Sequence, residues 1–269
     1  MKRKNTLWSV IVYIGIICSV LFLAGFGLGV TNIMSPGSVP FTEKPQLATP
    51  EVPENANPEE YRIVALGDSL TKGTGDDTGK GYVRRTMEKL SKEQAHSVTL
   101  VNNLAINGLR ADQLAERLKE EHIGYSLKQA NLILLTIGGN DLFQGAQSEQ
   151  LSSATLNIEY LNKKADESIS SMQSALKEIR AWNKEALIVM VGLYNPFSNL
   201  TEMKTVGNQV VERWNHAAQE IINKDSNMML IPTQDLFERN IGKYIAADHF
   251  HPNGLGYDAI ATRIVQSLP

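Results

Sequence analysis

The sequence predicts an α/β domain in which helices cover both faces of a sheet of about five parallel strands, a three-layer α/β/α sandwich. Two observations lead to this prediction. Apolar runs of strand length alternate with stretches of helical spacing along residues 61–269, and these runs are continuous instead of alternating with polar residues. Continuous apolar runs are typical of strands buried on both faces of a parallel sheet, and strand–helix alternation is typical of doubly wound folds.

Five runs are predicted as strands and five stretches as helices. The strands are Arg62–Leu66, Val98–Asn102, Leu132–Ile137, Leu187–Leu193 and Met228–Ile231. The helices are Tyr82–Glu93, Ala111–Glu121, Leu161–Trp182, Gly207–Asn223 and Leu255–Ser267. In open parallel sheets the chemistry lies beyond the carboxyl ends of the strands, so the residues that follow each strand are the first candidates for a site.

The N-terminal segment reads as a membrane anchor. Residues 8–30 contain no charged side chain, and 23 helical residues would extend about 34 Å, enough to cross a bilayer. Residues 1–7 carry Lys2, Arg3 and Lys4, which favour a cytoplasmic N-terminus and an extracytoplasmic C-terminal domain. The alternative is a cleaved signal peptide and a secreted domain, for which Gly27-Leu28-Gly29 offers a weak cleavage site.

Residues 31–60 are predicted to be a disordered linker between the anchor and the domain at 61–269. Proline cannot continue a helix, and this stretch holds six of the ten prolines of the chain: Pro36, Pro40, Pro45, Pro50, Pro53 and Pro58. The net charge of the chain is −3, and its basic residues form no stripe along the sequence. Both observations disfavour nucleic-acid binding. The single cysteine, Cys18, lies in the apolar segment, so the domain contains no disulfide and no thiolate metal site.

The parts of an activated serine lie at two distant places in the sequence. Ser69 follows the first strand in the motif Gly-Asp-Ser-Leu, and Asp248 and His251 lie three residues apart near the C-terminus. A serine hydroxyl becomes nucleophilic when an imidazole takes its proton, and a carboxylate fixes the tautomer of that imidazole. Pro252 biases His251 to an extended backbone, so Asp248 can reach its ring, whereas the side chain of the adjacent His249 diverges. Ser69 alone would equally fit a helix cap.

Two further candidates follow the second and third strands. Gly108 could present an unhindered backbone N–H to a developing oxyanion, although Asn-Gly is also a common turn pair. Asn140, in Gly-Gly-Asn-Asp, could donate its side-chain amide to the same oxyanion. Asp68 and Asp141 are predicted to organise local hydrogen bonds. No cluster of His and carboxylate residues has the spacing of a metal site.

These motifs, in this order along residues 61–269, resemble the SGNH (GDSL) hydrolase family. The resemblance implies a flavodoxin-like sandwich and no metal or organic cofactor. It implies Ser69 as nucleophile, His251 as general base and Asp248 as its partner. It also implies an oxyanion hole made by the backbone N–H groups of Ser69 and Gly108 and by the side chain of Asn140. The sequence Leu-Arg-Ala-Asp after Gly108 departs from the Asp-Thr that is common there in the family, which bears on substrate fit.

The expected function is that of a membrane-anchored, extracytoplasmic serine esterase or lipase that cleaves carboxylic acyl esters through an acyl-enzyme on Ser69. Its substrate would be a small acyl ester, a lipid or an acylated cell-wall glycan. Residues 142–161 and 194–206 are expected to wall the cleft. Two alternatives stay open: an acyltransferase that uses the same triad, and a non-catalytic module that binds glycans or lipids on the same fold.

Overall fold

The computed structural model of the protein describes residues 12–26, 60–93, 95–143 and 158–269. Residues 12–26 form an exposed helix in one unit of the chain, and the residues from 60 onward form a second, compact unit. Within these described ranges, no helix combines the length and the apolar character needed to cross a bilayer. The predicted anchor at 8–30 is therefore not supported by the described helix, and its remaining residues, like the predicted linker up to residue 59, lie outside the described ranges.

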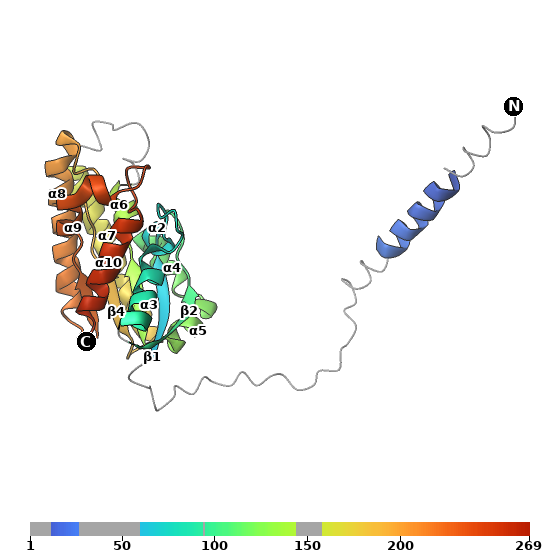
Figure 1. Ribbon diagram of the computed structural model, residues 1–269, viewed down its shortest axis with the longest axis horizontal. Coiled ribbons are helices and arrows are strands. Elements are labelled where there is room, and N and C mark those ends of the chain that lie inside the picture. Colours follow the sequence, from blue (N-terminus) through green and yellow to red (C-terminus); the bar gives the residue numbers. More distant parts are fainter. Residues whose placement is uncertain (1–11, 27–59, 94, 144–157) are drawn as a thin grey trace. The chain divides into compact units, whose positions relative to one another are not determined.

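A five-stranded parallel sheet forms the centre of the second unit (Figure 1). Its strands are β1 (Glu60–Gly67), β2 (Ser97–Asn103), β3 (Leu132–Thr136), β4 (Leu187–Val191) and β5 (Met228–Ile231). The order β2-β1-β3-β4-β5 is that of flavodoxin-like sheets. The five predicted strands and their parallel arrangement are confirmed. However, β2 is an edge strand with several exposed residues, so it is not buried on both faces.

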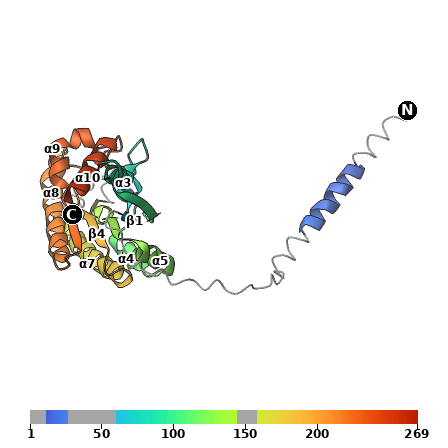
Figure 2. The same cartoon turned by 60° about the horizontal axis from the view of Figure 1, so that its bottom comes forward.

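Helices cover both faces of the sheet, as Figure 2 shows. They are α2 (Ser69–Lys72), α3 (Gly81–Glu93), α4 (Ala111–Arg117), α5 (Glu121–Gln129), α6 (Gly139–Phe143), α7 (Ile158–Trp182), α8 (Thr201–Ile222), α9 (Gln234–Tyr244) and α10 (Gly254–Ser267). One apolar core lies beneath α4, α5, α7 and α8, and a second lies beneath α3, α9 and α10. The three-layer sandwich is therefore confirmed.

The predicted helix at 111–121 is wrong at its C-terminal end. The chain bends at Leu118, so α4 and α5 are separate helices. The indole N–H of Trp182 donates to the carbonyl of Leu118 at 2.7 Å, and Gly124 in α5 packs so closely on the same indole that a Cβ would lie 2.5 Å from it. A tryptophan distant in sequence thus holds the bend. The helix α9 was not predicted, and α8 begins six residues earlier than its predicted start.

The first strand ends at a residue that must be glycine. Gly67 has a φ of 123°, and a Cβ there would lie 1.9 Å from the carbonyl oxygen of Thr136. Any other residue would push β1 away from the end of β3, because that contact is with backbone. This close approach fixes where the chain leaves the sheet, directly before Asp68 and Ser69.

Candidate active site

Ser69 is the first residue of the short helix α2 at the carboxyl end of β1. It is 4% exposed. The carboxylate of Asp68 caps this helix by accepting the backbone N–H of Leu70 at 3.0 Å and the hydroxyl of Thr136 at 2.7 Å. The N–H of Ser69 lies at the start of a helix, where backbone donors have no intrahelical acceptor and are available to an anion.

Asp248 and His251 lie in one closed turn that precedes α10. Ile245 and Pro252 form an antiparallel bridge at its base, where the N–H of Ala246 donates to the carbonyl of His251 at 2.8 Å. Inside the turn, Oδ1 of Asp248 accepts the backbone N–H groups of Phe250 and His251, both at 3.0 Å. The backbone N–H groups of Phe250 and His251 therefore fix the orientation of the carboxylate next to the ring of His251.

The imidazole of His251 contacts the hydroxyl of Ser69 on one side and the carboxylate of Asp248 on the other. Nε2 of His251 lies 2.8 Å from Oγ of Ser69, and Nδ1 lies 2.6 Å from Oδ2 of Asp248. A carboxylate only accepts hydrogen bonds, so the Nδ1–H tautomer is favoured and Nε2 is left to accept the proton of Ser69. The structure brings together all three predicted residues. His249 lies apart from them: it is exposed and has a φ of 58°.

The pKa of Asp248 is lowered in spite of its partial burial. Burial raises this pKa, but the hydrogen bonds from the ring of His251 and from the backbone N–H groups of Phe250 and His251 outweigh it. These bonds favour the charged form of the carboxyl. Asp248 thus stays ionised beside the imidazole, in the state that stabilises an imidazolium.

The segments that carry Gly108 and Asn140 are bonded to the nucleophile segment and to each other. The N–H of Ile106 donates to the carbonyl of Gly67 at 2.9 Å. Gly108 has a φ of 76°, in the left-handed region that favours glycine, and open space lies where its side chain would be. Asn140 is 5% exposed, and its amide donates one N–H to the carbonyl of Leu109 at 3.0 Å. Among the described residues, this bond leaves its second N–H for another acceptor.

Asp68 and Asp141 act as the local hydrogen-bond organisers that the sequence predicts. Asp141 accepts the N–H of Ala111 with both oxygens, at 3.2 and 3.1 Å, and so joins α6 to the start of α4. Burial raises the pKa of Asp141 to about 6. Complete burial also raises the pKa of Asp68, although the bonds from Thr136 and Leu70 oppose it.

Sequence reasoning missed two tyrosines that support the site. The hydroxyl of Tyr194 donates to the carbonyl of Phe250 at 2.8 Å, and its ring stacks on Phe237 with 3.9 Å between centroids. The hydroxyl of Tyr257 donates to the carbonyl of Thr74 at 2.7 Å. Tyr194 begins the segment 194–206 that was expected to wall the cleft, and Tyr257 lies in the predicted helix Leu255–Ser267. Neither placement indicates where the hydroxyl reaches, which only the fold reveals.

The predicted cleft walls are correct only in part. Asn195, Phe197 and Met203 are buried, so they do not line an open cleft; Phe197 packs edge-on against Phe143. A groove of about 360 Å³ lies beside the turn that carries the catalytic candidates, and it is lined by Pro196, Asn199, Ile241, Gly242, Ile245, Ala246, Ala247 and His249. Most of the predicted wall at 142–161 lies outside the described residues.

Comparisons with known proteins agree with this architecture. Residues 65–259 match the GDSL-like lipase/acylhydrolase family. The uncharacterized protein YpmR of Bacillus subtilis (strain 168) is 34% identical over 218 residues, which is 80% of this chain and 84% of that protein. The spore germination lipase LipC of Bacillus licheniformis is 26% identical over 210 residues, which is 76% of this chain and 94% of that protein.

The fold is similar to that of solved lipases. The crystal structure of the lipase Lip_vut3 from a goat rumen metagenome matches 76% of this chain and 95% of its own, with a TM-score of 0.67 at 24% identity. An extracellular lipase from Streptomyces rimosus matches with a TM-score of 0.59 at 17% identity, covering 77% of this chain and 100% of its own. The family match and the similarity to a lipase disfavour the non-catalytic alternative. The chain belongs to the GDSL-like lipase/acylhydrolase family and is a serine ester hydrolase.

Proposed function

We propose that the protein cleaves carboxylic esters through an acyl-enzyme on Ser69. The observation that carries this proposal is the pair of contacts at 2.8 and 2.6 Å that joins Ser69, His251 and Asp248. Oγ of Ser69 forms a bond to the acyl carbon while Nε2 of His251 takes its proton. The ester C–O bond then breaks, and the alcohol leaves with that proton. Water repeats the sequence on the acyl-enzyme, which releases the acid and frees Ser69.

Three donors would stabilise the oxyanion formed in both halves of the reaction. They are the backbone N–H groups of Ser69 and Gly108 and the second amide N–H of Asn140. The position of Ser69 at a helix start, the left-handed conformation of Gly108 and the bond between Asn140 and Leu109 support these roles. Asp248 stays negative and stabilises the imidazolium. Both charges that develop in the reaction, on the oxyanion and on the imidazole, thus have a stabilising partner.

The groove beside the closed turn is the proposed site for an apolar part of the substrate. Its walls include Ile241, Ile245 and Ala246, and it shares the segment 245–249 with the turn that carries Asp248. Pockets of this size and polarity suit small organic ligands. The proposed substrate class is a small acyl ester or a lipid, and an acylated cell-wall glycan is a further member of that class.

We also propose that the domain acts outside the cytoplasm. This proposal is supported by the basic residues Lys2, Arg3 and Lys4 ahead of the uncharged run at 8–30. Protease added to intact cells should then degrade the domain, and the mass of the cell-associated protein distinguishes a retained N-terminus from a cleaved one. Protection of the domain until the cells are lysed would contradict the proposal.

A chromogenic ester series from acetyl to palmitoyl, run beside labelling with a fluorophosphonate probe, tests the enzymatic proposal. The wild-type protein should hydrolyse part of the series and gain one probe mass on Ser69. Ser69→Ala should do neither. Hydrolysis by Ser69→Ala at the wild-type rate would refute the assigned nucleophile, and a product that forms only with an added alcohol would identify an acyltransferase.

A further inference from the structure

The loop at residues 73–80, between α2 and α3, packs against the turn that carries His251. A Cβ on Gly75 would lie 2.7 Å from the carbonyl oxygen of Pro252 and 2.8 Å from Cβ of His251. Gly75 has a φ of 91°, a conformation that favours glycine. The loop therefore approaches the turn as closely as a backbone can.

The same loop is bonded to the residue that carries the nucleophile. The carbonyl of Ser69 accepts the backbone N–H groups of Gly73 and Thr74, both at 3.0 Å. The carbonyl of Thr74 accepts the hydroxyl of Tyr257 in α10 at 2.7 Å. Two successive hydrogen-bonded contacts thus connect Ser69 to the helix that follows His251.

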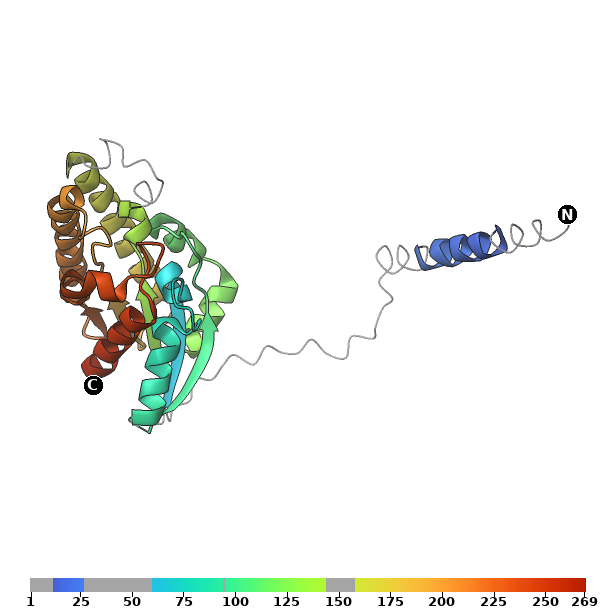
Figure 3. The ribbon, with the colours of Figure 1, turned by 45° about the horizontal axis from the view of Figure 1, so that its top comes forward.

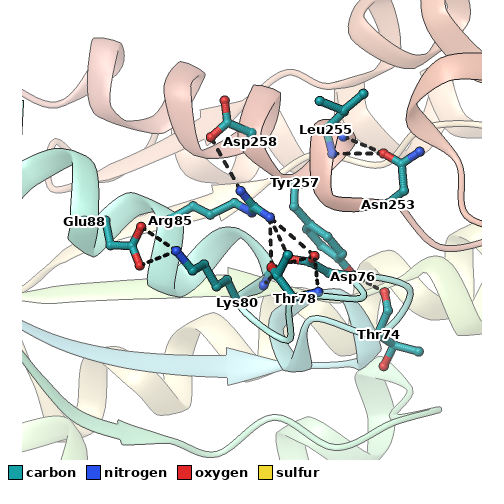
Figure 4. Close-up of polar contacts among 12 residues, drawn as sticks. Thr74, Asp76, Thr78, Lys80, Arg85, Glu88, Asn253, Leu255, Tyr257 and Asp258 are labelled. Atoms are coloured by element: carbon teal, nitrogen blue, oxygen red, sulfur yellow. Dashed lines mark hydrogen bonds and ion pairs between the residues drawn. The ribbon is translucent and has the colours of Figure 1, made fainter.

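An ion pair between Asp76 and Arg85 holds this loop in shape (Figure 4). The side chain of Asp76 is 1% exposed, and Nη2 of Arg85 donates to its Oδ2 at 3.0 Å. The carboxylate also accepts the N–H and the hydroxyl of Thr78, at 3.0 and 2.8 Å, and the N–H of Gly81 at 2.9 Å. Both oxygens of Asp76 are thus occupied by donors from the loop and from α3.

The pair also lies directly against the start of α10. A Cβ on Gly254 would lie 3.0 Å from Nη2 of Arg85 and 3.1 Å from Oδ1 of Asp76. One turn further along α10, Asp258 forms ion pairs with Nζ of Lys89 at 3.2 Å and with Nη1 of Arg85 at 3.8 Å. Helices α3 and α10 lie side by side in Figures 1 and 3. Arg85 therefore contacts both the loop that follows Ser69 and the helix that follows His251.

We propose that Asp76 and Arg85 are positioning residues for the reaction: their ion pair fixes the 73–80 loop between α2 and α10 and thereby sets the separation of Ser69 and His251. The inference rests on the proposed roles of those two residues. The two halves of the site are 182 positions apart in sequence, and the Ser69–His251 bond is their direct polar contact. An element that contacts both halves controls that distance. Neither Asp76 nor Arg85 touches the reacting atoms, so both act through the backbone.

Loss of the ion pair should lower kcat without changing KM. A misplacement of about 1 Å between reacting groups costs on the order of 10²-fold in rate. We expect Asp76→Asn, which keeps the shape of the side chain and removes its charge, to lower kcat about 10- to 100-fold on a short chromogenic ester. The rate of fluorophosphonate labelling of Ser69 should fall in the same proportion, because it also needs the hydroxyl activated by His251.

The matched control is Asp225→Asn. Asp225 forms an ion pair with Arg180 at 2.6 Å. The two arginine side chains are equally exposed, at 16%, while the side chain of Asp225 is 31% exposed and that of Asp76 is 1% exposed. This second pair joins the end of α7 to the segment before β5. It therefore lies at the amino ends of the strands, opposite the carboxyl ends that carry the site. Both substitutions should lower the melting temperature. Only Asp76→Asn should lower kcat, when all variants are assayed well below their melting temperatures.

Conservative replacement provides a second route in case Asp76→Asn does not fold. Arg85→Lys keeps the positive charge but loses the guanidinium fork, whose Nη2 donates to Asp76 and Thr78 and whose Nη1 lies 3.8 Å from Asp258. Its kcat should therefore lie between those of wild type and Arg85→Gln. Equal kcat values for Asp76→Asn, Asp225→Asn and wild type, or an Arg85→Lys rate equal to that of Arg85→Gln, would overturn the positioning role. Activity in Ser69→Ala would instead overturn the proposed nucleophile.

Discussion

Asp248→Asn tests the tautomer argument directly, because the substitution changes one oxygen into a donor. Oδ1 of Asp248 is held by two backbone N–H groups, those of Phe250 and His251. The asparagine oxygen should therefore take that position, which turns its NH₂ toward Nδ1 of His251. The imidazole must then carry its proton on Nε2, facing Oγ of Ser69 at 2.8 Å, and it loses the lone pair that accepts the serine proton.

The expected loss in kcat has a lower and an upper bound. The wrong tautomer costs about 10⁴ in kcat in serine proteases with the same arrangement. The introduced amide could instead rotate and offer its oxygen to Nδ1, but it would give up two backbone hydrogen bonds worth about 1 kcal/mol each. About 2 kcal/mol corresponds to roughly 30-fold in rate. We therefore expect kcat to fall by about 30-fold to 10⁴-fold.

The assay is steady-state hydrolysis of a short p-nitrophenyl ester, with kcat and KM determined separately. KM should change little, since Asp248 lies behind the imidazole and away from the substrate. Asp77→Asn is the control, because it removes an exposed carboxylate from the neighbouring loop. A kcat for Asp248→Asn within threefold of wild type would refute the assignment of Asp248 as the group that sets the tautomer of His251.

Three further predictions follow from the site. Asn140→Ala should lower kcat by about 10²–10³ with KM nearly unchanged, because it removes one oxyanion donor; a wild-type kcat would exclude that role. Activity should fall on acidification toward pH 4, since a protonated His251 cannot accept a proton, and a flat pH profile would contradict a histidine base. Burial raises the pKa of Asp141 to about 6 from 3.8, so its ionisation costs the folded state up to about 3 kcal/mol above pH 6. Asp141→Asn should therefore be more stable in urea at pH 8, and the gain should shrink toward pH 4; a gain independent of pH would show another cause.

The sequence was sufficient where the information is local. Asp248 and His251 lie three residues apart, so their contact depends on one turn and was predicted correctly. Ser69 was placed at the site because it follows a buried strand, and parallel strands bring their carboxyl ends to one edge of the sheet. The strand positions were predictable for the same reason, since each is a short apolar run between polar turns.

The contacts that depend on tertiary packing were not predictable. The bend between α4 and α5 is caused by Trp182, whose indole reaches Leu118 across 64 positions, while the local sequence there reads as one continuous helix. Asp76 belongs to a run of Gly, Asp and Thr that reads as an ordinary turn. Its ion pair with Arg85 gains significance only because α10 packs on α3, which no periodicity in either segment reveals.

The closed turn at 245–252 makes the acid–base pair a transferable unit. The bridge between Ile245 and Pro252 and the two bonds to Oδ1 of Asp248 are all internal to this short peptide. Exchange of the peptide between homologous enzymes should therefore carry an intact dyad into the recipient. The recipient scaffold must still place its serine within hydrogen-bond distance of the imidazole. Residues on the outer surface of the turn can therefore vary between homologues, while the internal hydrogen bonds of the turn are inherited together.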